Sequence, residues 1–483
     1  MRHPRLPPIV LFAARLLAAC LATVPAHSAP EAPAAPRNLP KYVVGACAGC
    51  HGTSLEGGSA PSLVDATWKF GGSDDQIAAS IRVGNPQAGM PAFGGSLSEK
   101  DIRGLVVHLR ELASKASQRT NPAPRLNEKA LNSSRLHSFL IETSTSNLVE
   151  PWSLAFLPDG RSLVTEKGGT LRVIVAGVAG APVVGTPPVD ASGQGGLFDV
   201  VPHPEFARNG WIYLIFADPQ KKSDGKVQSM TAVVRGRIQG NTWNEQEVVF
   251  RAPLSTYRGS GGVHFGGRMA FDRAGFLFFS IGERGQGPDA QNLSLPNGKI
   301  HRVHDDGRIP ADNPFVAQAG AMPSIWSYGH RNPQGLRIDP ATDLLWEHEH
   351  GPRGGDELNR IQRGRNYGWP LATYGINYNG TSITDLTARA DLESPLTAWV
   401  PSIAPCGLSV YSGDRFPLWK THLFVSALGS KELRRIQIKE GQVVDQEIIL
   451  KAPGRLRDVT TSPDGLIYLL LPDRVARLVP GGP

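Results

Sequence analysis

Six stretches of the chain share one pattern, and this repetition constrains the fold more than any other feature. Each stretch is a short apolar strand, a turn rich in Pro, Asp or Gly, and a second β-rich strand. They are SLAFLPDGRSLVTE (153–166), LFDVVPHPEFARNGWIYLIF (197–216), RMAFDRAGFLFFSIGE (268–283), GLRIDPATDLLWEHE (335–349), GLSVYSGDRFPLWKTHLFVSA (407–427) and DVTTSPDGLIYLLLP (458–472). Taken as one blade each, they predict an all-β six-bladed β-propeller. Long insertions separate the copies, and we expect them to gather at one face, around the central channel.

The N-terminus reads as an export signal. Arg2, Arg5 and Arg15 accompany the apolar run LLAACLATV, and AHSA follows as a small-residue cleavage site. This pattern predicts a signal peptide over 1–28. LAAC, ending at Cys20, offers the alternative of a lipid-modified cysteine, which Arg15 disfavours because it interrupts the apolar run. We therefore expect a periplasmic protein, with a membrane anchor only if Cys20 is lipidated.

Charge and hydropathy argue against nucleic acid binding and against a membrane-spanning segment after the signal. The formal net charge is +7, and three of the arginines lie in the signal. The remaining excess is mild and forms no basic stripe interleaved with aromatic residues, so nucleic acid is not an expected partner. After the signal, no stretch reaches the ~20 apolar residues that a membrane span needs.

CAGCH, at residues 47–51, predicts a covalently bound haem. Cys47 and Cys50 can add to the two vinyl groups of a haem, and His51 then reaches the iron. A zinc site would need two further soft ligands at similar spacing, and none follows. A dithiol redox site would not require His51.

A compact block surrounds this motif, over 41–116. A Pro/Ala spacer (29–40) precedes the block, and a polar linker with two prolines (117–136) follows it. The block closes with LSEKDIRGLVVHLRELASK, where a cap at Ser98 and apolar residues at helical spacing predict a helix. Met90 lies between, in a Gly/Pro-rich loop. Its thioether is suited to be the second axial ligand, although methionine also serves as a core filler. The block resembles small class I cytochromes c, so a small all-α domain should precede the propeller (137–483).

Polar residues able to do chemistry cluster in the insertions between blades. His264 precedes the third repeat and Glu283 ends it, which indicates a general base oriented by a carboxylate, with raised proton affinity. Arg331 and Asn332 lie on a turn before the fourth repeat. Taken singly, each of these residues could equally be an ordinary polar loop residue.

Two further groups point to ions. Gly351 and Pro352 offer main-chain carbonyls, which suit a hard cation such as calcium. Arg455 and Arg457 alternate along a predicted strand and suit carboxylates. Taken alone, these residue types indicate a site that binds an anionic ligand beside a general base and passes electrons to a haem.

Longer motifs allow a resemblance to be stated. They are PWSLAFLPDG, GQGGLFDVVPHPEF, HFGGRMAF, IWSYGHRNPQG, EHGPRGGDELNRI, NYGWP, WVPSIAP and RLRDV. In this order, from Glu150 to Leu478, the chain resembles soluble quinoprotein sugar dehydrogenases of the glucose/sorbosone dehydrogenase family, and the aldose sugar dehydrogenases most of all. The resemblance implies a six-bladed propeller that binds pyrroloquinoline quinone (PQQ) with calcium.

The resemblance also assigns roles to single positions. It places the catalytic base at His264, its orienting carboxylate at Glu283, where the family typically has Asp, and the quinone carbonyl contact at Arg331 with Asn332. Further PQQ or sugar contacts fall on Gln194, Ser402, Arg455 and Arg457. Gly429 stands where several relatives have a PQQ-contacting lysine, and Lys431 is the nearby candidate.

Two calcium sites follow from the same resemblance. Active-site calcium would lie on the carbonyls of Gly351 and Pro352. Glu357 and the Tyr367 carbonyl resemble ligands of a second, structural calcium.

The expected activity is the oxidation of an aldose at C1 to its lactone. PQQ, calcium and haem c are the expected cofactors, and a periplasmic cytochrome or terminal oxidase is the expected acceptor. Two alternatives stay open at this point. One is a PQQ dehydrogenase of another alcohol or aldehyde, such as a sorbosone-type substrate. The other is a propeller that binds sugar or protein and carries a haem.

Overall fold

Most of the helices precede the strands along the chain, and only the short α5 (Phe206–Asn209) and short 3-10 helices lie among the strands that the structure describes. The computed structural model describes residues 38–65, 67–120 and 122–481. The predicted signal peptide, Cys20 and most of the predicted spacer lie outside these ranges. In the described part of the chain, no helix is both long enough and apolar enough to cross a bilayer.

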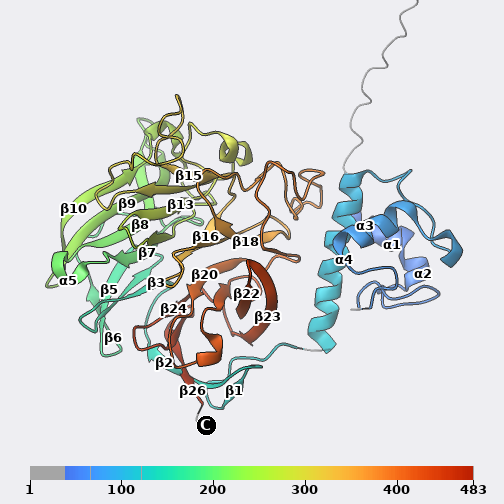
Figure 1. Ribbon diagram of the computed structural model, residues 1–483, viewed down its shortest axis with the longest axis horizontal. Helices are drawn as coiled ribbons and strands as arrows, with labels where there is room; N and C mark the ends of the chain where they lie inside the picture. The colour runs from blue at the N-terminus through green and yellow to red at the C-terminus, as the bar shows by residue number, and fades with distance from the viewer. Residues whose placement is uncertain (1–37, 66, 121, 482–483) are drawn as a thin grey trace, which may run out of the picture. The chain divides into compact units, whose positions relative to one another are not determined.

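The first described segment is helical, as predicted. Its helices are α1 (Leu39–Ala46), α2 (Ala48–His51), α3 (Asp74–Val83), the short 3-10 helix η1 (Pro86–Ala88) and α4 (Glu99–Thr120), and Figure 1 labels the four α-helices. At the start of α4, the Ser98 hydroxyl accepts from the Asp101 N–H at 3.1 Å, and Asp101 Oδ2 accepts from the Ser98 N–H at 3.2 Å. This reciprocal cap confirms the predicted helix start. Ile102, Leu105 and Leu109 then face an apolar core shared with α1 and α3.

Helix α4 is longer than the sequence pattern indicates. It runs to Thr120, past the predicted linker start at Ser117, and α1 begins at Leu39, inside the predicted spacer. Residues 115–119 are polar except for Ala116 and are mostly tolerated in helices, and the next proline is Pro122. The helix therefore continues to Thr120 and ends just before Pro122, because proline cannot extend it.

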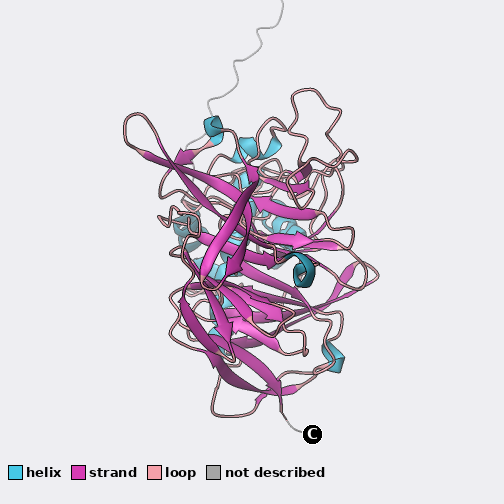
Figure 2. Cartoon of the chain, turned by 90° about the vertical axis from the view of Figure 1, so that its left-hand side faces the viewer, coloured by secondary structure: helices cyan, strands magenta, loops and turns pink. Residues whose placement is uncertain are grey.

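The remainder of the described chain is a six-bladed propeller, which confirms the predicted fold. Each blade is a sheet of antiparallel strands in chain order, joined by loops, and Figure 2 shows these strands in magenta. The first three blades are β3 (Pro151–Phe156), β4 (Ser162–Glu166), β5 (Thr170–Val175) and β6 (Val178–Pro182); β7 (Leu197–Pro202), β8 (Ile212–Lys221), β9 (Val227–Gln239) and β10 (Thr242–Arg251), with the short β11 (Arg258–Gly259) on β9; and β12 (Met269–Phe271), β13 (Leu277–Ile281), β14 (Lys299–Val303) and β15 (Ile325–Tyr328).

The last three blades follow the same plan, with one exception. They are β16 (Pro333–Ile338), β17 (Leu345–Glu349), β18 (Asp356–Ile361) and β19 (Thr397–Trp399); β20 (Pro405–Val410), β21 (Leu423–Ala427), β22 (Glu432–Lys439) and β23 (Gln442–Lys451); and β24 (Asp458–Thr461), β25 (Ile467–Leu470), β26 (Val475–Pro480), β2 (Ser138–Thr145) and β1 (Asn132–Ser133). The exception is the sixth blade, where β2 from the start of the domain pairs with β26 from its end. This pairing closes the ring.

The first strand of each blade lies innermost. β3, β7, β12, β16, β20 and β24 each contact the first strand of the next blade, and β24 contacts β3. The six inner strands therefore line the central channel and run in the same direction along it. Apolar side chains between adjacent blades form the cores, as Trp152, Phe198 and Phe265 do between the first three blades.

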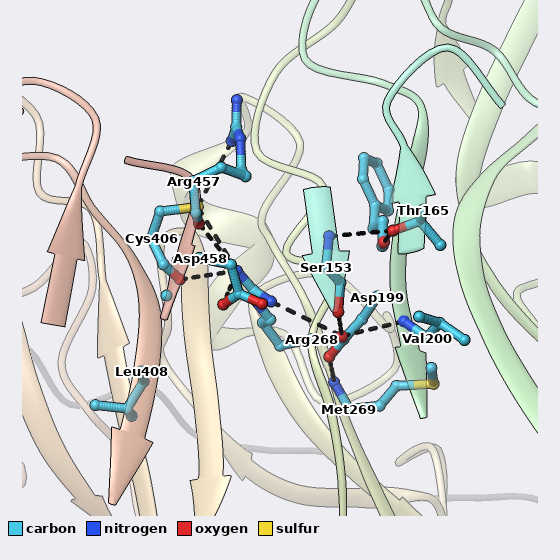
Figure 3. A network of polar contacts seen from close by, with 12 residues as sticks. Ser153, Thr165, Asp199, Val200, Arg268, Met269, Cys406, Leu408, Arg457 and Asp458 are labelled. Atoms are coloured by element: carbon cyan, nitrogen blue, oxygen red, sulfur yellow. Dashed lines mark hydrogen bonds and ion pairs between the residues drawn. The ribbon is translucent and has the colours of Figure 1, made fainter. Parts of the chain in front are cut away.

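A buried arginine lies inside the ring of inner strands. Arg268 is 1 % exposed, and its guanidinium stacks 4.1 Å from the ring of Trp152. Its Nη2 lies 3.1 Å from Asp458 Oδ1, and its Nη1 lies 3.8 Å from Asp199 Oδ1 (Figure 3). Further bonds run from Arg268 to the carbonyls of Gln334, Cys406 and Arg457, and from Ser153 to Asp199. This polar network draws on residues at the inner strands of all six blades.

Candidate functional site

The strand order explains why the predicted site residues come together. Gln194, His264, Arg331, Asn332, Ser402, Arg455 and Arg457 each lie on the loop just before an inner strand. Glu283 follows β13, Gly351 and Pro352 follow β17, and Lys431 follows β21, and each of these strands is antiparallel to its inner neighbour. Because the inner strands run in the same direction, all of these loops lie at one end of the channel.

His264 and Glu283 form a hydrogen-bonded pair. His264 Nδ1 lies 2.6 Å from Glu283 Oε1, and the two side chains are 13 % and 3 % exposed. The Gln194 Oε1 accepts from the main-chain N–H of His264 at 2.8 Å. The structure thus brings together three residues from the loops of two blades. With Nδ1–H donating to the carboxylate, the Nε2 lone pair of His264 is free to accept a proton.

The backbone at His264 is constrained by close packing. His264 has a φ of 54°, which is unusual for a residue with a side chain. A Cβ atom on Gly282 would lie 2.3 Å from the His264 carbonyl oxygen. Only a glycine at position 282 therefore allows the chain that leads to Glu283 to pass this close to His264. This close approach fixes the separation between base and carboxylate.

The predicted rise in the proton affinity of His264 is wrong. Burial lowers the pKa of His264 below its usual value, and Arg331 and Arg284 lower it further, against the opposing effect of Glu283. Burial is invisible in the sequence, which shows only the carboxylate. The consequence favours catalysis, because an imidazole with a lowered pKa is neutral at pH 7 and ready to accept a proton.

The main chain at Arg331 and Asn332 is hydrogen-bonded to the Glu349 carboxylate. Glu349 Oε2 accepts from the main-chain N–H groups of both residues, the second at 3.2 Å. Arg331 Nη1 donates to the carbonyls of His350 at 2.9 Å and Gly351 at 2.8 Å. The Glu283 N–H donates to the Arg331 carbonyl at 2.9 Å, which ties the guanidinium-bearing loop to the base pair.

Gly351 and Pro352 are buried in the turn after β17. Asp356, four residues further on, accepts from the Gly351 N–H and from the Ser402 hydroxyl. Burial raises the pKa of Asp356 to about 6, while its hydrogen bonds act in the opposite direction. A cation on the two carbonyls would therefore have a buried carboxylate near it, and oxygen donors with a carboxylate close by suit calcium.

The two arginines before β24 differ in their surroundings. They lie on a loop, so the predicted strand placement is wrong: β24 begins only at Asp458. Arg457 Nη1 donates to Cys406 Sγ at 3.6 Å, whereas Arg455 is exposed. Lys431 is exposed before β22 and makes no side-chain hydrogen bond or ion pair within the described ranges.

Glu349 also belongs to a buried group of two acids and one histidine next to Arg331. The carboxylates of Glu347 and Glu349 and a ring nitrogen of His330 lie within 4.8 Å of one another. Glu357, predicted to hold a structural calcium, lies opposite Glu349 in the β17–β18 ladder, and the ring of Tyr367 stacks on His330 at 4.7 Å. Burial and then the charge of Glu349 raise the pKa of both Glu347 and Glu357.

The helical domain holds a separate cavity of about 370 Å³. Cys47, Cys50, His51 and Met90 all line it, together with apolar residues that include Leu105 of α4. His51 Nδ1 lies 2.6 Å from the Pro61 carbonyl, which orients the ring and leaves Nε2 for a metal. Two thiols, one imidazole and one thioether around a mostly apolar cavity fit a haem attached through Cys47 and Cys50.

The sequence prediction missed three carboxylates and one arginine. Glu349 and Asp356 flank the GPRGG turn. The only feature that could have indicated their role is that they are acidic residues in strands whose other residues are mostly buried. Arg268 and Asp199 support the channel from inner-strand positions. An arginine directly after two glycines, in HFGGRMAF, is the signal that could have indicated a buried ion pair.

Comparisons with known proteins agree with this division into two parts. Residues 148–479 match the family model described as glucose/sorbosone dehydrogenase, and residues 34–109 match the model described as cytochrome c oxidase, cbb3-type, subunit III. The aldose sugar dehydrogenase YliI of Escherichia coli (strain K12) is 44 % identical over 352 residues, which is 71 % of this chain and 92 % of the relative.

Solved structures show the same likeness. The apo form of the soluble aldose sugar dehydrogenase from Escherichia coli is 40 % identical, covers 71 % of this chain and 100 % of its own, and has a TM-score of 0.65. The PQQ-bound aldose sugar dehydrogenase of Streptomyces coelicolor is 26 % identical, covers 71 % of this chain and 98 % of its own, and has a TM-score of 0.56.

Proposed function

Since the chain belongs to the glucose/sorbosone dehydrogenase family, we propose that it oxidises an aldose at C1 to the lactone, with PQQ and a covalent haem c as successive electron acceptors. The observation that carries this proposal is the His264–Glu283 pair beside Arg331, at one end of the propeller channel. A module that only bound sugar would have no use for a base held by a carboxylate next to a guanidinium.

The residues of the chain divide the chemistry between them. Nε2 of His264 takes the proton from the anomeric hydroxyl, and Glu283 keeps the ring oriented and stabilises the imidazolium that forms. When bound, PQQ supplies an ortho-quinone that accepts the hydride from C1. Arg331 stabilises the negative charge that develops during this transfer, as fixed charges aimed at a reacting centre do.

Cofactor binding falls to the surrounding loops. Arg455 and Arg457 would pair with the carboxylates of PQQ, and Gln194, Asn332 and Ser402 would add polar contacts. Calcium would lie on the carbonyls of Gly351 and Pro352. Lys431 is the candidate for the additional lysine contact found in relatives.

Electrons leave through the helical domain in this proposal. His51 and Met90 would ligate the haem iron, and a haem with one thioether ligand has a raised potential that suits an electron acceptor. The final recipient would be a periplasmic cytochrome or terminal oxidase, in keeping with the expected export of the chain.

One experiment tests the proposal as a whole. The purified, haem-loaded and oxidised protein is given PQQ and calcium, then a panel of aldoses, and the absorbance band of reduced haem is followed. Haem reduction that requires both PQQ and sugar supports the proposal. Bound PQQ without haem reduction by any aldose contradicts the substrate class or the transfer to haem, and failure to bind PQQ favours a binding module instead.

A further inference from the structure

Asp356 is a buried carboxylate that joins two loops of the candidate site. It is 0 % exposed. Its Oδ1 accepts from the Gly351 N–H at 2.8 Å, in the turn after β17. Its Oδ2 accepts from the Ser402 hydroxyl at 2.6 Å and from the N–H groups of Ile403 and Ala404, both at 2.7 Å, in the segment that enters the next blade. One side chain therefore fixes the turn that bears the predicted calcium carbonyls and the loop that bears Ser402.

Asp356 has no cationic partner, and this distinguishes it from comparable residues. Glu432, equally buried, pairs with Arg434 at 2.6 Å and with Lys451 at 2.8 Å. Asp458 lies 3.1 Å from Arg268. Within the described ranges, no lysine, arginine or histidine forms an ion pair with Asp356, whose partners are one hydroxyl and three main-chain N–H groups. Buried charges in proteins are normally paired or lie near a metal.

Asp356 lacks a positive partner, whereas the predicted calcium ligands lack a negative charge. The carbonyls of Gly351 and Pro352 are neutral, and the charged group bonded to the Gly351 carbonyl is the cationic Arg331. A divalent cation at this turn would have no negative charge among its two main-chain ligands. The turn itself is tight, since a Cβ on Gly351 would lie 2.3 Å from the Gly355 carbonyl group, so the turn has little freedom to bring in another ligand.

We propose that Asp356 is the charge counterpart and positioning residue of the active-site calcium: it acts through Gly351 and the Ser402 loop and supplies the negative charge that the carbonyl ligands lack. The inference rests on the proposed function, because calcium at this turn is part of that function. It predicts that the charge of Asp356, more than any one of its hydrogen bonds, sets the affinity for calcium.

The test measures PQQ binding to the full-length, haem-loaded protein by calorimetry at a series of calcium concentrations. The readout is the calcium concentration that half-saturates PQQ binding, which reports on this site and requires no turnover. Asp356→Asn removes the charge and keeps the shape. Asp339→Asn is the matched control, because Asp339 also accepts two local hydrogen bonds in the same blade, in the turn at the opposite strand end.

We expect Asp356→Asn to raise the half-saturating calcium concentration at least tenfold and Asp339→Asn to leave it unchanged. Melting in the presence of a chelator shows whether each variant is folded. An unchanged calcium requirement in folded Asp356→Asn overturns the inference while PQQ binding still supports the proposed function. Calcium-independent PQQ binding by the unaltered protein also overturns the inference, and absence of PQQ binding overturns both.

Asp356→Glu keeps the test decisive if Asp356→Asn does not fold. This change keeps the negative charge and moves the carboxylate by one methylene group, which alters its four hydrogen bonds. We expect a change of less than threefold in the calcium requirement. A larger change would show that hydrogen-bond geometry, and not charge, controls the site, and would overturn the inference.

Discussion

The imidazole of His264 meets the carboxylate of Glu283 across 2.6 Å, from Nδ1 to Oε1, at the open ends of one β-hairpin. The hairpin is β12–β13, so the two residues are set by a single ladder of main-chain hydrogen bonds. Placing both on one rigid element fixes the direction of the free Nε2 lone pair. This geometry makes the role of His264 directly testable.

Replacing His264 by Gln should reduce turnover by roughly 10² to 10⁴, the usual cost of losing a general base. PQQ affinity should change little, because the proposed role of the side chain is toward the sugar and the glutamine amide is of similar size. Steady-state rates with PQQ-loaded protein check this. His304→Gln, at the opposite strand end, serves as the control. Undiminished turnover in His264→Gln would remove His264 from the role of base.

The pH dependence follows from the lowered pKa of His264. The base works when deprotonated, so kcat/KM should rise with pH through a pKa below the usual 6.5 and stay level above it. Glu283 acts to raise this pKa, so Glu283→Gln should shift the acid limb to lower pH. Turnover should also fall, by about 10² to 10⁴, through loss of ring orientation. An acid limb that moves to higher pH in Glu283→Gln would contradict this account.

Arg268→Met should destabilise the propeller strongly. The change leaves Asp199 and Asp458 buried without a cation, at a cost of about 3–5 kcal/mol for a broken buried pair. Urea denaturation followed by tryptophan fluorescence measures the free energy of unfolding. Arg161→Met breaks an exposed pair with Asp159 and should cost less than about 1 kcal/mol. Equal losses in the two variants would show that the channel network contributes nothing special.

Met90→His should lower the haem midpoint potential, because a thioether ligand favours reduced iron relative to a second imidazole. The shift should be on the order of 100 mV, within the roughly 0.8 V range that axial ligands cover. Potentiometric titration of the haem band measures it. Met322→His, in the loop before β15, is the control. An unchanged potential in Met90→His would show that Met90 is a core residue.

Lys431→Ala should weaken PQQ binding less than Arg457→Ala does. Lys431 is exposed, and an exposed charge acts weakly through solvent, whereas Arg457 is half-buried at the channel mouth next to Cys406. Calorimetry with PQQ compares the two variants. A larger loss in Lys431→Ala would mean that this lysine takes over the contact made by the lysine of relatives at the position of Gly429.

The fold was predictable because each blade is a local unit. The strand–turn–strand pattern of 153–166 becomes β3 and β4, and 458–472 becomes β24 and β25, without help from distant residues. The end of α4 was less predictable, because its last turn is polar and offers no periodic apolar signal.

The support of the site could not be predicted, because it joins distant parts of the chain. Ser402 bonds to Asp356 across 46 positions, and Gln194 to His264 across 70. Burial is also absent from the sequence, which is why the pKa of His264 was expected to move in the wrong direction. Chemistry-bearing residues are thus visible in motifs, whereas their electrostatic environment emerges only from packing.

The pairing of β2 with β26 has a consequence for biosynthesis. The strand that completes the sixth blade, β2, is made before the other blades, and its partner β26 (Val475–Pro480) is made after them. The ring cannot close until β26 has been synthesised. Any truncation that removes β26 would leave both β2 and β25 with an unpaired edge, so a premature stop just before Val475 should expose aggregation-prone strands although every predicted site residue is still encoded.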